Sequence, residues 1–229
     1  MTTVSPVGTC GFAVLAAGSG SRFGGAKQVA VLGGRTMVEH AIAIADRARR
    51  PPSPIVVVTG AHQAEVERTV VPLLGNYSGL SMCHNPDWSL GMSTSLRTGI
   101  DHLERTASDV EAVLFMLSDQ PLVSPDLLCS LQQRWHQGWT MAAPVHEGKL
   151  LGAPALFGRV WWPCIRNLQG DRGARGILET HQDEVGGVET DPGQLADIDA
   201  RQDLRHHTGA FIPGDCAPRH GSDRTHAAE

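Results

Sequence analysis

Short, uninterrupted apolar runs alternate along the chain with longer segments in which apolar residues recur at helical spacing. Runs that are apolar throughout are typical of strands buried on both faces, whereas spacings of three and four residues are typical of amphipathic helices. The predicted strands span residues 12–16, 55–59, 80–84 and 112–117. The predicted helices span residues 36–49, 62–71 and 93–105, and a fourth begins at Ser124.

The order of these elements predicts the fold class. Strands that alternate with helices form parallel sheets covered on both faces, so we expect an α/β three-layer sandwich with a mostly parallel, Rossmann-like central sheet. The second half is more mixed, with candidate strands at residues 141–145, 153–157 and 195–198. We expect residues 1–212 to form a single domain and residues 213–229 a disordered tail, whose histidines are then solvated rather than metal ligands.

Composition and charge exclude several classes of protein. The net charge of −5 and the lack of a basic stripe argue against a nucleic-acid binder. No apolar run approaches the length of a membrane span, and the apolar stretch at residues 11–17 is too short for a signal peptide. The five cysteines are far apart and form no C-x-x-C, so we expect reduced thiols in a cytoplasmic protein.

Glycine is the residue in excess: 26 of the 229 residues are glycine, against a usual share of about 7%. Several gather in the segment of residues 15–28, LAAGSGSRFGGAKQ, directly after the first predicted strand. This is not a dinucleotide fingerprint, because Phe23 stands where G-x-G-x-x-G needs its third glycine. It is not a P-loop either, because Ala26 separates Gly25 from Lys27.

The glycine loop offers a row of backbone N–H groups together with one arginine and one lysine. Such N–H groups bind phosphates, and glycine lets the backbone approach them without a Cβ clash. The guanidinium of Arg22 can bind phosphate oxygens in a bidentate manner, and the ammonium of Lys27 can stabilise the charge that develops when the nucleotidyl group is transferred. We therefore predict a triphosphate cradle, with a structural turn carrying two solvated cations as the alternative. The predicted nucleotide-binding residues here are Leu15, Ala16, Ala17, Gly18, Gly20, Ser21, Gly24 and Gly25.

Two acidic motifs follow strand-like runs. Asp119 comes directly after the run at 112–117, which places its carboxylate at the carboxyl edge of a parallel sheet. Mg²⁺ takes one or two carboxylates together with substrate phosphates, so Asp119 is the predicted magnesium ligand, although an aspartate can also simply open a turn before proline. Asp197 and Asp199 share one side if they lie on a strand. Asp199 is a second candidate metal ligand, with helix capping as the alternative.

The segment of residues 85–99, NPDWSLGMSTSLRTG, reads as a loop that runs into the start of a helix. Free N–H groups at a helix start and serine hydroxyls can hydrogen-bond a nucleobase or a ribose. We predict that Gly91 and Ser95 contact the nucleotide. The alternative is a capped helix with Trp88 packed in the core.

The glycine loop resembles the signature L-A-A-G-x-x-x-R-[MF]-G-x-x-K of the MobA-like nucleotidyltransferases, and the branch most similar to this chain is the molybdenum cofactor cytidylyltransferases. Residues 85–99, LSDQPLV at 117–123 and DIDARQDL at 197–204 resemble further motifs of that branch. The resemblance implies a fold of the nucleotide-diphospho-sugar transferase type, with nucleotide bound by the N-terminal half and acceptor by the C-terminal half. It also implies that Arg22, Lys27 and Asp119 carry the catalysis.

The acceptor side follows from two more resemblances. GAPALF at 152–157 resembles G-H-P-x-L-[FI], with Ala153 where many relatives have histidine, and LQGDRGAR at 168–175 resembles L-x-G-D-x-G-[AV]-R. The glycines of the second motif predict a tight turn before a helix, and the arginines there suit the phosphate of the acceptor. The alternative role for Asp171 is to cap that helix. The predicted acceptor-binding residues are Gly152, Asp171, Arg172 and Arg175.

The expected reaction is Mg²⁺-dependent transfer of a nucleoside monophosphate to a phosphorylated acceptor, with release of pyrophosphate. The branch resemblance implies CTP as donor, molybdopterin cofactor as acceptor and a molybdoenzyme as the recipient of the product. Leu-Ala-Ala-Gly favours a pyrimidine, since guanylyl-transferring relatives usually have Leu-Ala-Gly-Gly. Two alternatives remain open at this point: transfer to another metabolite, such as a sugar or polyol phosphate, and a non-catalytic accessory protein that hands on a cofactor. An oxidoreductase lacks its fingerprint.

Overall fold

One eight-stranded sheet runs through the computed structural model, which describes residues 8–204. Its strands lie in the order β10-β7-β9-β6-β1-β4-β5, and β8 pairs with β7. All neighbours on the main path are parallel except β9, which is antiparallel to both β6 and β7. The strands are β1 Thr9–Ala16, β4 Ile55–Thr59, β5 Leu80–His84, β6 Val110–Leu117, β7 Met141–His146, β8 Lys149–Leu150, β9 Ala155–Gly158 and β10 Val185–Glu189.

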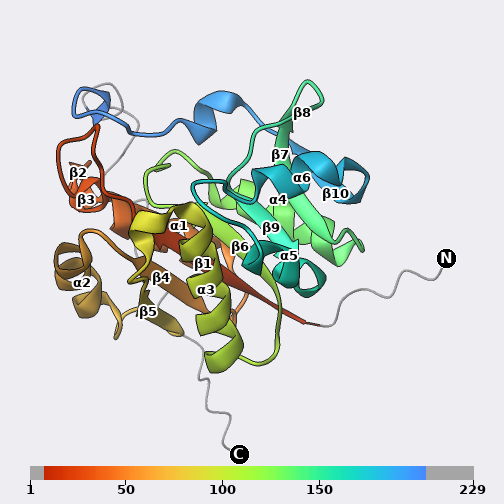
Figure 1. The fold of residues 1–229 in the computed structure, drawn as a ribbon, viewed down its shortest axis with the longest axis horizontal. Coiled ribbons are helices and arrows are strands. Elements are labelled where there is room, and N and C mark those ends of the chain that lie inside the picture. Colours follow the sequence, from red (N-terminus) through yellow and green to blue (C-terminus); the bar gives the residue numbers. More distant parts are fainter. Residues whose placement is uncertain (1–7, 205–229) are drawn as a thin grey trace, which may run out of the picture.

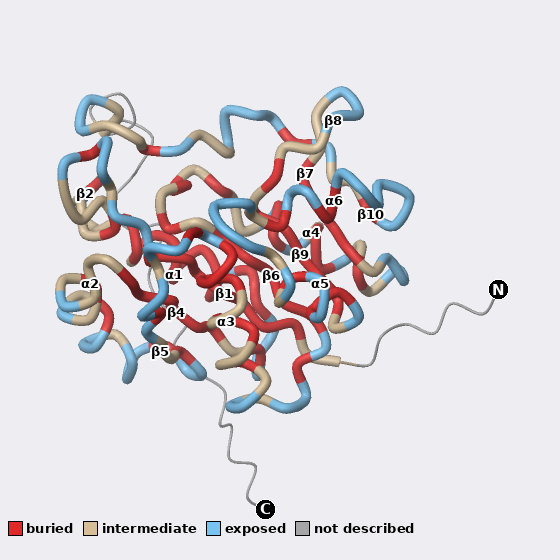
Figure 2. Tube along the Cα trace, viewed as in Figure 1, coloured by how far each residue is buried: buried red, intermediate tan, exposed pale blue. Residues whose placement is uncertain are grey.

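Helices cover both faces of this sheet (Figure 1). They are α1 Met37–Ala48, α2 Gln63–Val70, α3 Met92–Thr106, α4 Pro125–His136, α5 Trp162–Arg166 and α6 Arg175–Thr180. Successive residues of β1 point to opposite faces. Phe12 and Val14 pack in the core with α1, α2 and α4, whereas Ala13 and Leu15 pack with α3, α5 and α6. The strands are accordingly buried from both sides (Figure 2), and the predicted three-layer α/β sandwich with a mostly parallel sheet is confirmed.

Local sequence signals account for several helix starts. Thr36 accepts a hydrogen bond from the backbone N–H of Glu39, whose carboxylate accepts one from the Thr36 N–H in return, which forms a capping box before α1. Ser124 accepts from the Leu127 N–H, and Pro125 occupies the first turn of α4, where its missing N–H is not needed. These starts could be predicted because each cap depends on residues at most three positions apart.

The second half departs from the sequence prediction most clearly in two segments. The predicted strand at 195–198 is wrong: a short 3₁₀ turn, Pro192–Leu195, leads into extended chain that pairs with no strand. The eighth strand is instead β10, VGGVE, whose two glycines hide any apolar pattern. A Cβ at Gly186 would lie 2.8 Å from both Arg134 and Trp139, so glycine is what lets this edge strand approach α4. The predicted tail at 213–229 lies outside the described residues.

The chain after β10 crosses the carboxyl edge of the sheet, running in Figure 1 over the top of the molecule towards the small hairpin of β2 Val31–Leu32 and β3 Arg35–Thr36. The backbone N–H of Ile198 donates to the carbonyl of Asp119 at 2.9 Å, which anchors this crossing beside the end of β6. Parallel strands gather their following loops at one edge. The crossing therefore brings Asp197 and Asp199 to the edge that already carries Asp119 and the glycine loop.

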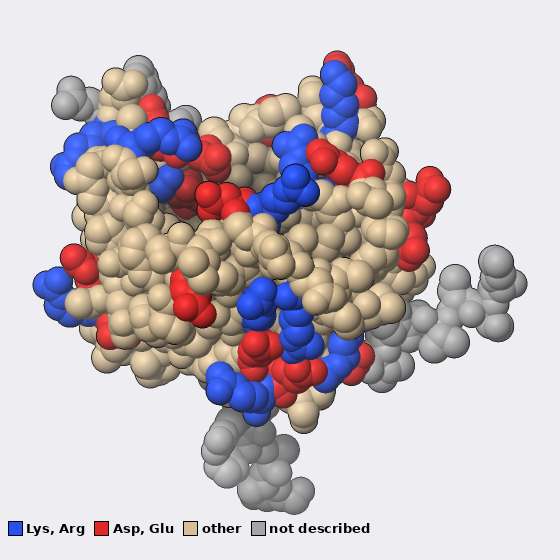
Figure 3. Space-filling model, in the orientation of Figure 1, with Lys and Arg blue, Asp and Glu red and all other residues tan. Residues whose placement is uncertain are grey.

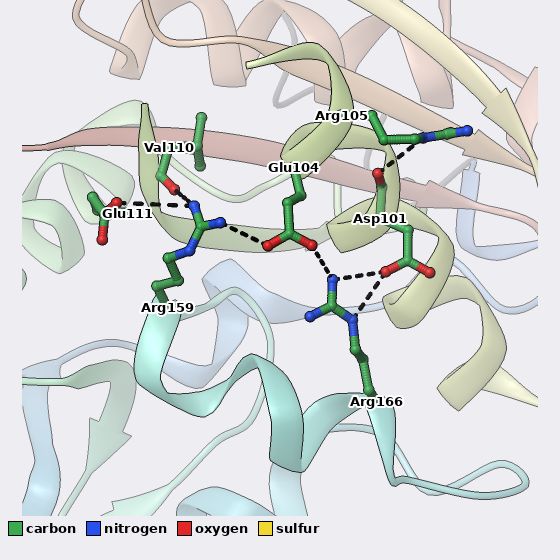
Figure 4. Close-up of polar contacts among 7 residues, drawn as sticks. All are labelled: Asp101, Glu104, Arg105, Val110, Glu111, Arg159 and Arg166. Atoms are coloured by element: carbon green, nitrogen blue, oxygen red, sulfur yellow. Dashed lines mark hydrogen bonds and ion pairs between the residues drawn. The ribbon is translucent and has the colours of Figure 1, made fainter. Parts of the chain in front are cut away.

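Ion pairs hold α3 to the segment before and within α5 (Figure 4). Glu104 bridges two arginines, accepting from Arg159 and from Arg166 at 2.6 Å each, and Arg166 also contacts Asp101 at 2.8 Å. This network fixes the flank of the helix whose N-terminus faces the glycine loop. No helix within residues 8–204 is both long enough and apolar enough to cross a bilayer.

Candidate active site

The glycine loop is folded tightly onto itself. Gly20 has φ +59°, and the N–H groups of Gly24 and Gly25 donate to its carbonyl at 2.9 and 3.4 Å. A Cβ at Gly20 would overlap the Gly25 carbonyl oxygen, so no other residue fits there without moving the loop. In this closed loop Arg22 points into solvent, and the chain then runs back to the edge of the sheet, where Lys27 lies.

Gln28 holds the start of this loop. Its side chain is 3% exposed, and its Nε2 donates to the Gly18 carbonyl at 2.6 Å. Gln28 belongs to the loop sequence, but the motif patterns gave it no role. The signal that could have singled it out is its position directly after Lys27, where a buried amide can reach back across the loop.

Lys27 joins the glycine loop to both acidic motifs. Its ammonium lies 2.6 Å from Asp119 and 3.1 Å from Asp199, and Arg22 contacts the other oxygen of Asp199 at 2.7 Å. The Arg22 side chain is 81% exposed, and such exposed ion pairs contribute only about 0–1 kcal/mol. The Arg22 guanidinium can therefore exchange Asp199 for a phosphate at little cost.

The charges of this group reinforce one another. Burial by itself lowers the pKa of Lys27, but the Asp119 and Asp199 carboxylates more than offset this and raise the pKa above its ordinary value. The hydrogen bond from Lys27 lowers the pKa of Asp199. Burial, followed by the nearby Asp119 carboxylate, raises the pKa of Asp197. Lys27 is thus held as a cation and Asp199 as an anion across neutral pH.

A cavity of about 410 Å³, here called the glycine-loop cavity, opens between this charged group and α3. Figure 3 shows a hollow at the centre of this face with acidic side chains in it and basic groups on both sides. The cavity brings together twelve of the predicted site residues from five separate stretches of chain. They are Leu15, Ala17, Gly18, Gly20, Ser21, Arg22, Lys27, Gly91, Ser95, Asp119, Asp171 and Asp199.

Four predicted residues line no part of this cavity or of the second chamber described below. The Ala16 side chain packs in the core on the opposite face of β1, because neighbouring strand residues point opposite ways. Gly24 and Gly25 form the outer turn of the loop instead of lining the hollow. Arg172 is exposed and touches neither space.

The start of α3 forms the wall facing the glycine loop. Asn85, which is 1% exposed, donates to the hydroxyls of Thr94 and Ser95 at 2.8 and 2.9 Å, so the Ser95 side chain is already oriented. Trp88 is half-buried and lines the cavity, unlike the core position considered as an alternative. No side chain caps α3, but its first turn is partly satisfied by backbone groups, because the N–H groups of Ser93 and Thr94 donate to the carbonyls of Gly170 and Gly91, each at 3.2 Å.

A second chamber of about 220 Å³ lies next to the glycine-loop cavity and shares Leu15, Met92 and Leu117 with it. Gly152 and Arg175 line this chamber, whereas Asp171, predicted for the acceptor, lines the glycine-loop cavity. Asp171 also does not cap α6, because the residue before that helix is Ala174, with no side-chain cap bond.

The residues present fit a divalent cation held jointly by protein and substrate. The described part of the chain contains no group of three or more candidate metal-ligand side chains. Asp119 and Asp199 nevertheless converge on one cationic group, the Lys27 ammonium, so their oxygens already face a common position. Mg²⁺ is usually held by one or two carboxylates, with phosphates and waters completing its shell. Two carboxylates beside a triphosphate-sized space meet that requirement.

Comparison with known proteins defines the class. The fold and the loop constellation are those of a nucleotidyltransferase, and residues 12–185 match the model of the MobA-like NTP transferase domain. The chain belongs to this family. It is 30% identical over 129 residues to the purine catabolism protein PucB of Bacillus subtilis, an alignment that covers 54% of this chain and only 58% of that relative.

Solved structures share the fold across most of the chain. Rv0371c from Mycobacterium tuberculosis H37Rv superposes with a TM-score of 0.72 at 20% identity, covering 88% of this chain and 98% of that one. A nucleotidyl transferase from Methanothermobacter thermautotroptrophicus superposes with a TM-score of 0.70 at 21% identity, covering 88% and 97%. At these identities the likeness concerns the fold, and the family assignment comes from the sequence model.

Proposed function

We propose that this protein transfers CMP from CTP to a phosphorylated acceptor, molybdopterin cofactor, with release of pyrophosphate. The observation that carries the proposal is the group formed by Arg22, Lys27, Asp119 and Asp199 at the edge of a cavity walled by the glycine loop. It offers cations for phosphates and carboxylates for a metal within one space, next to a separate chamber for a second substrate. The product passes to a molybdoenzyme in the cytoplasm.

The chemistry needs no protein nucleophile. The acceptor's own phosphate, which is largely ionised near neutral pH since its second pKa is about 6, attacks the α-phosphorus in line while pyrophosphate leaves. Catalysis is then positioning and charge stabilisation. Lys27 neutralises the α-phosphate oxygens, and Arg22 swings from Asp199 to the departing phosphates. The glycine-loop N–H groups hold the triphosphate in place.

The proposed metal ion is Mg²⁺, held by Asp119 and Asp199. When bound, it supplies positive charge to the phosphate oxygens and orients the triphosphate. Lys27 now contacts both of these carboxylates, so nucleotide binding has to draw the ammonium towards phosphate as the carboxylates turn to the metal. Metal and nucleotide therefore support each other's binding.

The choice of CTP rests on the crowding around Ala17. A Cβ at Gly60 would lie 2.7 Å from the Ala17 methyl and 2.8 Å from the Trp88 Cβ, so these three residues meet with no space between them. Ala17 and Trp88 both line the glycine-loop cavity. The methyl group at Ala17 narrows the wall where a base would lie, which favours a pyrimidine over the larger guanine.

Two alternatives keep the same site but change its partner. Another phosphorylated metabolite could serve as acceptor, and the name of the Bacillus subtilis relative, a purine catabolism protein, mentions no molybdenum cofactor. A non-catalytic accessory role would need a site that binds nucleotide without turning it over. The cations and carboxylates that turnover needs are all in place, which favours the enzyme.

The test is pyrophosphate release by the purified full chain with each of CTP, UTP, ATP and GTP, offered molybdopterin or glucose 1-phosphate. We expect release with CTP and molybdopterin only, and a lower rate of release in Asp119→Asn. Preference for GTP would overturn the base assignment. Release with the sugar phosphate alone would overturn the acceptor, and no release with any pair would favour the accessory role.

A further inference from the structure

Four successive carbonyl groups of the glycine loop, those of residues 17–20, are all engaged in hydrogen bonds. The first and the last are held by backbone groups. The N–H of Ala61 donates to the carbonyl of Ala17 at 3.1 Å, and the N–H groups of the outer turn donate to the carbonyl of Gly20. The middle two are held by side chains from other segments, so these are the bonds that a substitution can remove.

Gln28 and His62 supply the two side-chain bonds. The Nε2 of Gln28 donates to the Gly18 carbonyl at 2.6 Å, and the Nε2 of His62 contacts the Ser19 carbonyl at 2.9 Å. A carbonyl oxygen can only accept, so the His62 ring carries a proton on Nε2 and donates it. His62 precedes α2 but makes no side-chain cap bond to that helix, and its ring reaches the glycine loop instead.

The direction of these carbonyls sets the direction of the N–H groups that follow them. In a planar trans peptide the C=O and the N–H of one unit point in opposite directions. The bonds from Gln28 and His62 therefore fix the N–H groups of Ser19 and Gly20. Within residues 8–204 neither N–H donates to another protein group, and both residues line the glycine-loop cavity. Two free donors thus lie at the cavity wall with their directions already set.

Glycine makes this anchoring necessary. Gly18 and Gly20 flank Ser19, and a peptide group next to glycine can rotate with little steric resistance. A peptide group that turned over would present its carbonyl oxygen to a phosphate in place of its N–H. The attraction between the loop and the phosphate would then become repulsion. The side-chain bonds to the two carbonyls oppose this rotation.

Gln28 carries a cost in stability that its loop bond explains. Its Oε1 is buried and accepts no hydrogen bond in the part of the chain that the structure describes. A buried acceptor without a donor is unfavourable, so packing alone would favour an apolar side chain at this position. The bond to the Gly18 carbonyl is what the amide supplies and an apolar side chain could not.

We propose that Gln28 and His62 are positioning residues for the triphosphate. By fixing two peptide groups, they direct the N–H groups of Ser19 and Gly20 at the phosphates of the nucleotide. This inference deepens the proposed function and rests on it for the location of the triphosphate. Both side chains act through the backbone, and the N–H groups donate to phosphate whichever base the nucleotide carries.

The test is the binding of inorganic tripolyphosphate to the full chain in the presence of Mg²⁺, measured by isothermal titration calorimetry. This probe has neither base nor acceptor, so it reports on the phosphates alone. Gln28→Met keeps the length of the side chain and His62→Phe keeps a ring, but both lose the donor. Each variant should bind tripolyphosphate at least about fivefold more weakly than the wild type, the equivalent of about one hydrogen bond.

The rescue variant is His62→Gln, whose amide restores an N–H donor. It should bind tripolyphosphate within about twofold of the wild type, because the Ser19 carbonyl again has a partner. A recovery of this kind separates the hydrogen bond from the bulk of the ring.

Gln132→Met is the matched control for Gln28→Met. Gln132 is 7% exposed, and its Nε2 donates to the carbonyls of Ala48 and Leu128 at 3.1 Å each, but it does not line the glycine-loop cavity. Gln132→Met should lower stability in urea and leave tripolyphosphate affinity unchanged. Gln28→Met should lower the affinity with a smaller loss of stability, because it removes an unsatisfied acceptor together with one bond.

The outcomes distinguish this inference from the proposed function. Wild-type affinity for tripolyphosphate in both Gln28→Met and His62→Phe would overturn the inference and leave the proposed function intact. An equal loss of affinity in Gln132→Met, or no recovery in His62→Gln, would attribute the losses to general damage and overturn it as well. No binding by the wild type would overturn the triphosphate cradle itself. If GTP proves to be the donor, the base assignment fails while the losses in the two variants stand.

Discussion

Gly91 and Gly170 lie in direct backbone contact, so that a Cβ at Gly91 would overlap the carbonyl group of Gly170. The N–H of Ser93 donates to the same carbonyl at 3.2 Å. The sequence motifs placed Gly91 with the nucleotide and Gly170 with the acceptor. Their contact means that the segment predicted for the nucleotide and the segment predicted for the acceptor share one wall.

Gly91→Ala should therefore damage both stability and nucleotide binding. The substitution combines a backbone clash with a φ of +110°, which favours glycine, and overpacking of this kind costs about 1–3 kcal/mol. Urea unfolding measures the loss, and the KM for the nucleotide should rise several-fold. Gly75→Ala is the matched control, because a Cβ at Gly75 meets nothing within 4 Å. Equal behaviour of the two variants would show that the shared wall is dispensable.

Lys27→Met should lower the rate of nucleotidyl transfer by about 10²–10³-fold, the usual loss when one charge-stabilising group is removed. The same variant should bind Mn²⁺ more tightly in the absence of nucleotide, because Asp119 and Asp199 lose the ammonium that they now contact. Pyrophosphate release and the electron paramagnetic resonance signal of free Mn²⁺ measure the two effects. Lys149→Met, at an exposed position in β8, should change neither.

Asp119→Asn should raise the magnesium concentration that the reaction needs as well as lower its rate. The amide keeps the shape of the side chain but loses its charge, so the Mg²⁺ concentration at half-maximal pyrophosphate release should rise at least about tenfold, the equivalent of about 1.4 kcal/mol. Asp199→Asn should shift the same concentration in the same direction. An unchanged magnesium dependence in both variants would remove these carboxylates from the metal site.

Glu104→Gln should destabilise the protein by no more than about 1 kcal/mol, because the Glu104 side chain is 37% exposed and partly screened. Two arginines nevertheless depend on it (Figure 4), so its effect should exceed that of Glu179→Gln, which breaks one exposed pair. Thermal unfolding at low and at high salt measures both. High salt should reduce the loss of stability caused by Glu104→Gln. A loss of stability that does not depend on salt would point to packing instead of charge.

The contribution of the Lys27 ion pairs to stability should be constant across neutral pH. The pKa of Asp199 is lowered by Lys27, so its contribution is present above its ordinary pKa and is lost as the pH falls through the lower value of the folded state. The pKa of Lys27 is raised, so its contribution is present below its ordinary 10.5 and is lost as the pH rises through the higher value. Melting of wild type and Lys27→Met should differ by the same amount from about pH 5 to pH 9. A difference that fades within that range would contradict the coupling.

The sheet and the glycine loop could be predicted because their signals are local. β4 and β5 were predicted at their observed bounds, and for β4 the reason is plain, since an apolar run ended by glycine is a property of neighbouring positions. β10 was missed because its pairing with β7 depends on Gly186 fitting against Trp139, a residue far earlier in the chain. No pattern within the sequence VGGVE predicts that contact.

The amino-acid sequence by itself determined the three-layer α/β class, the closed glycine loop and the residue types suited to phosphate and metal, because propensity, capping and charge act between near neighbours. Only the tertiary structure decided which of these residues meet. The crossing chain after β10 puts Asp199 against Arg22 and Lys27 and Asp197 beside Gln120, and the fold as a whole moves Asp171 to the nucleotide side. Such encounters depend on how distant segments pack at one sheet edge, and that packing is a property of the whole fold.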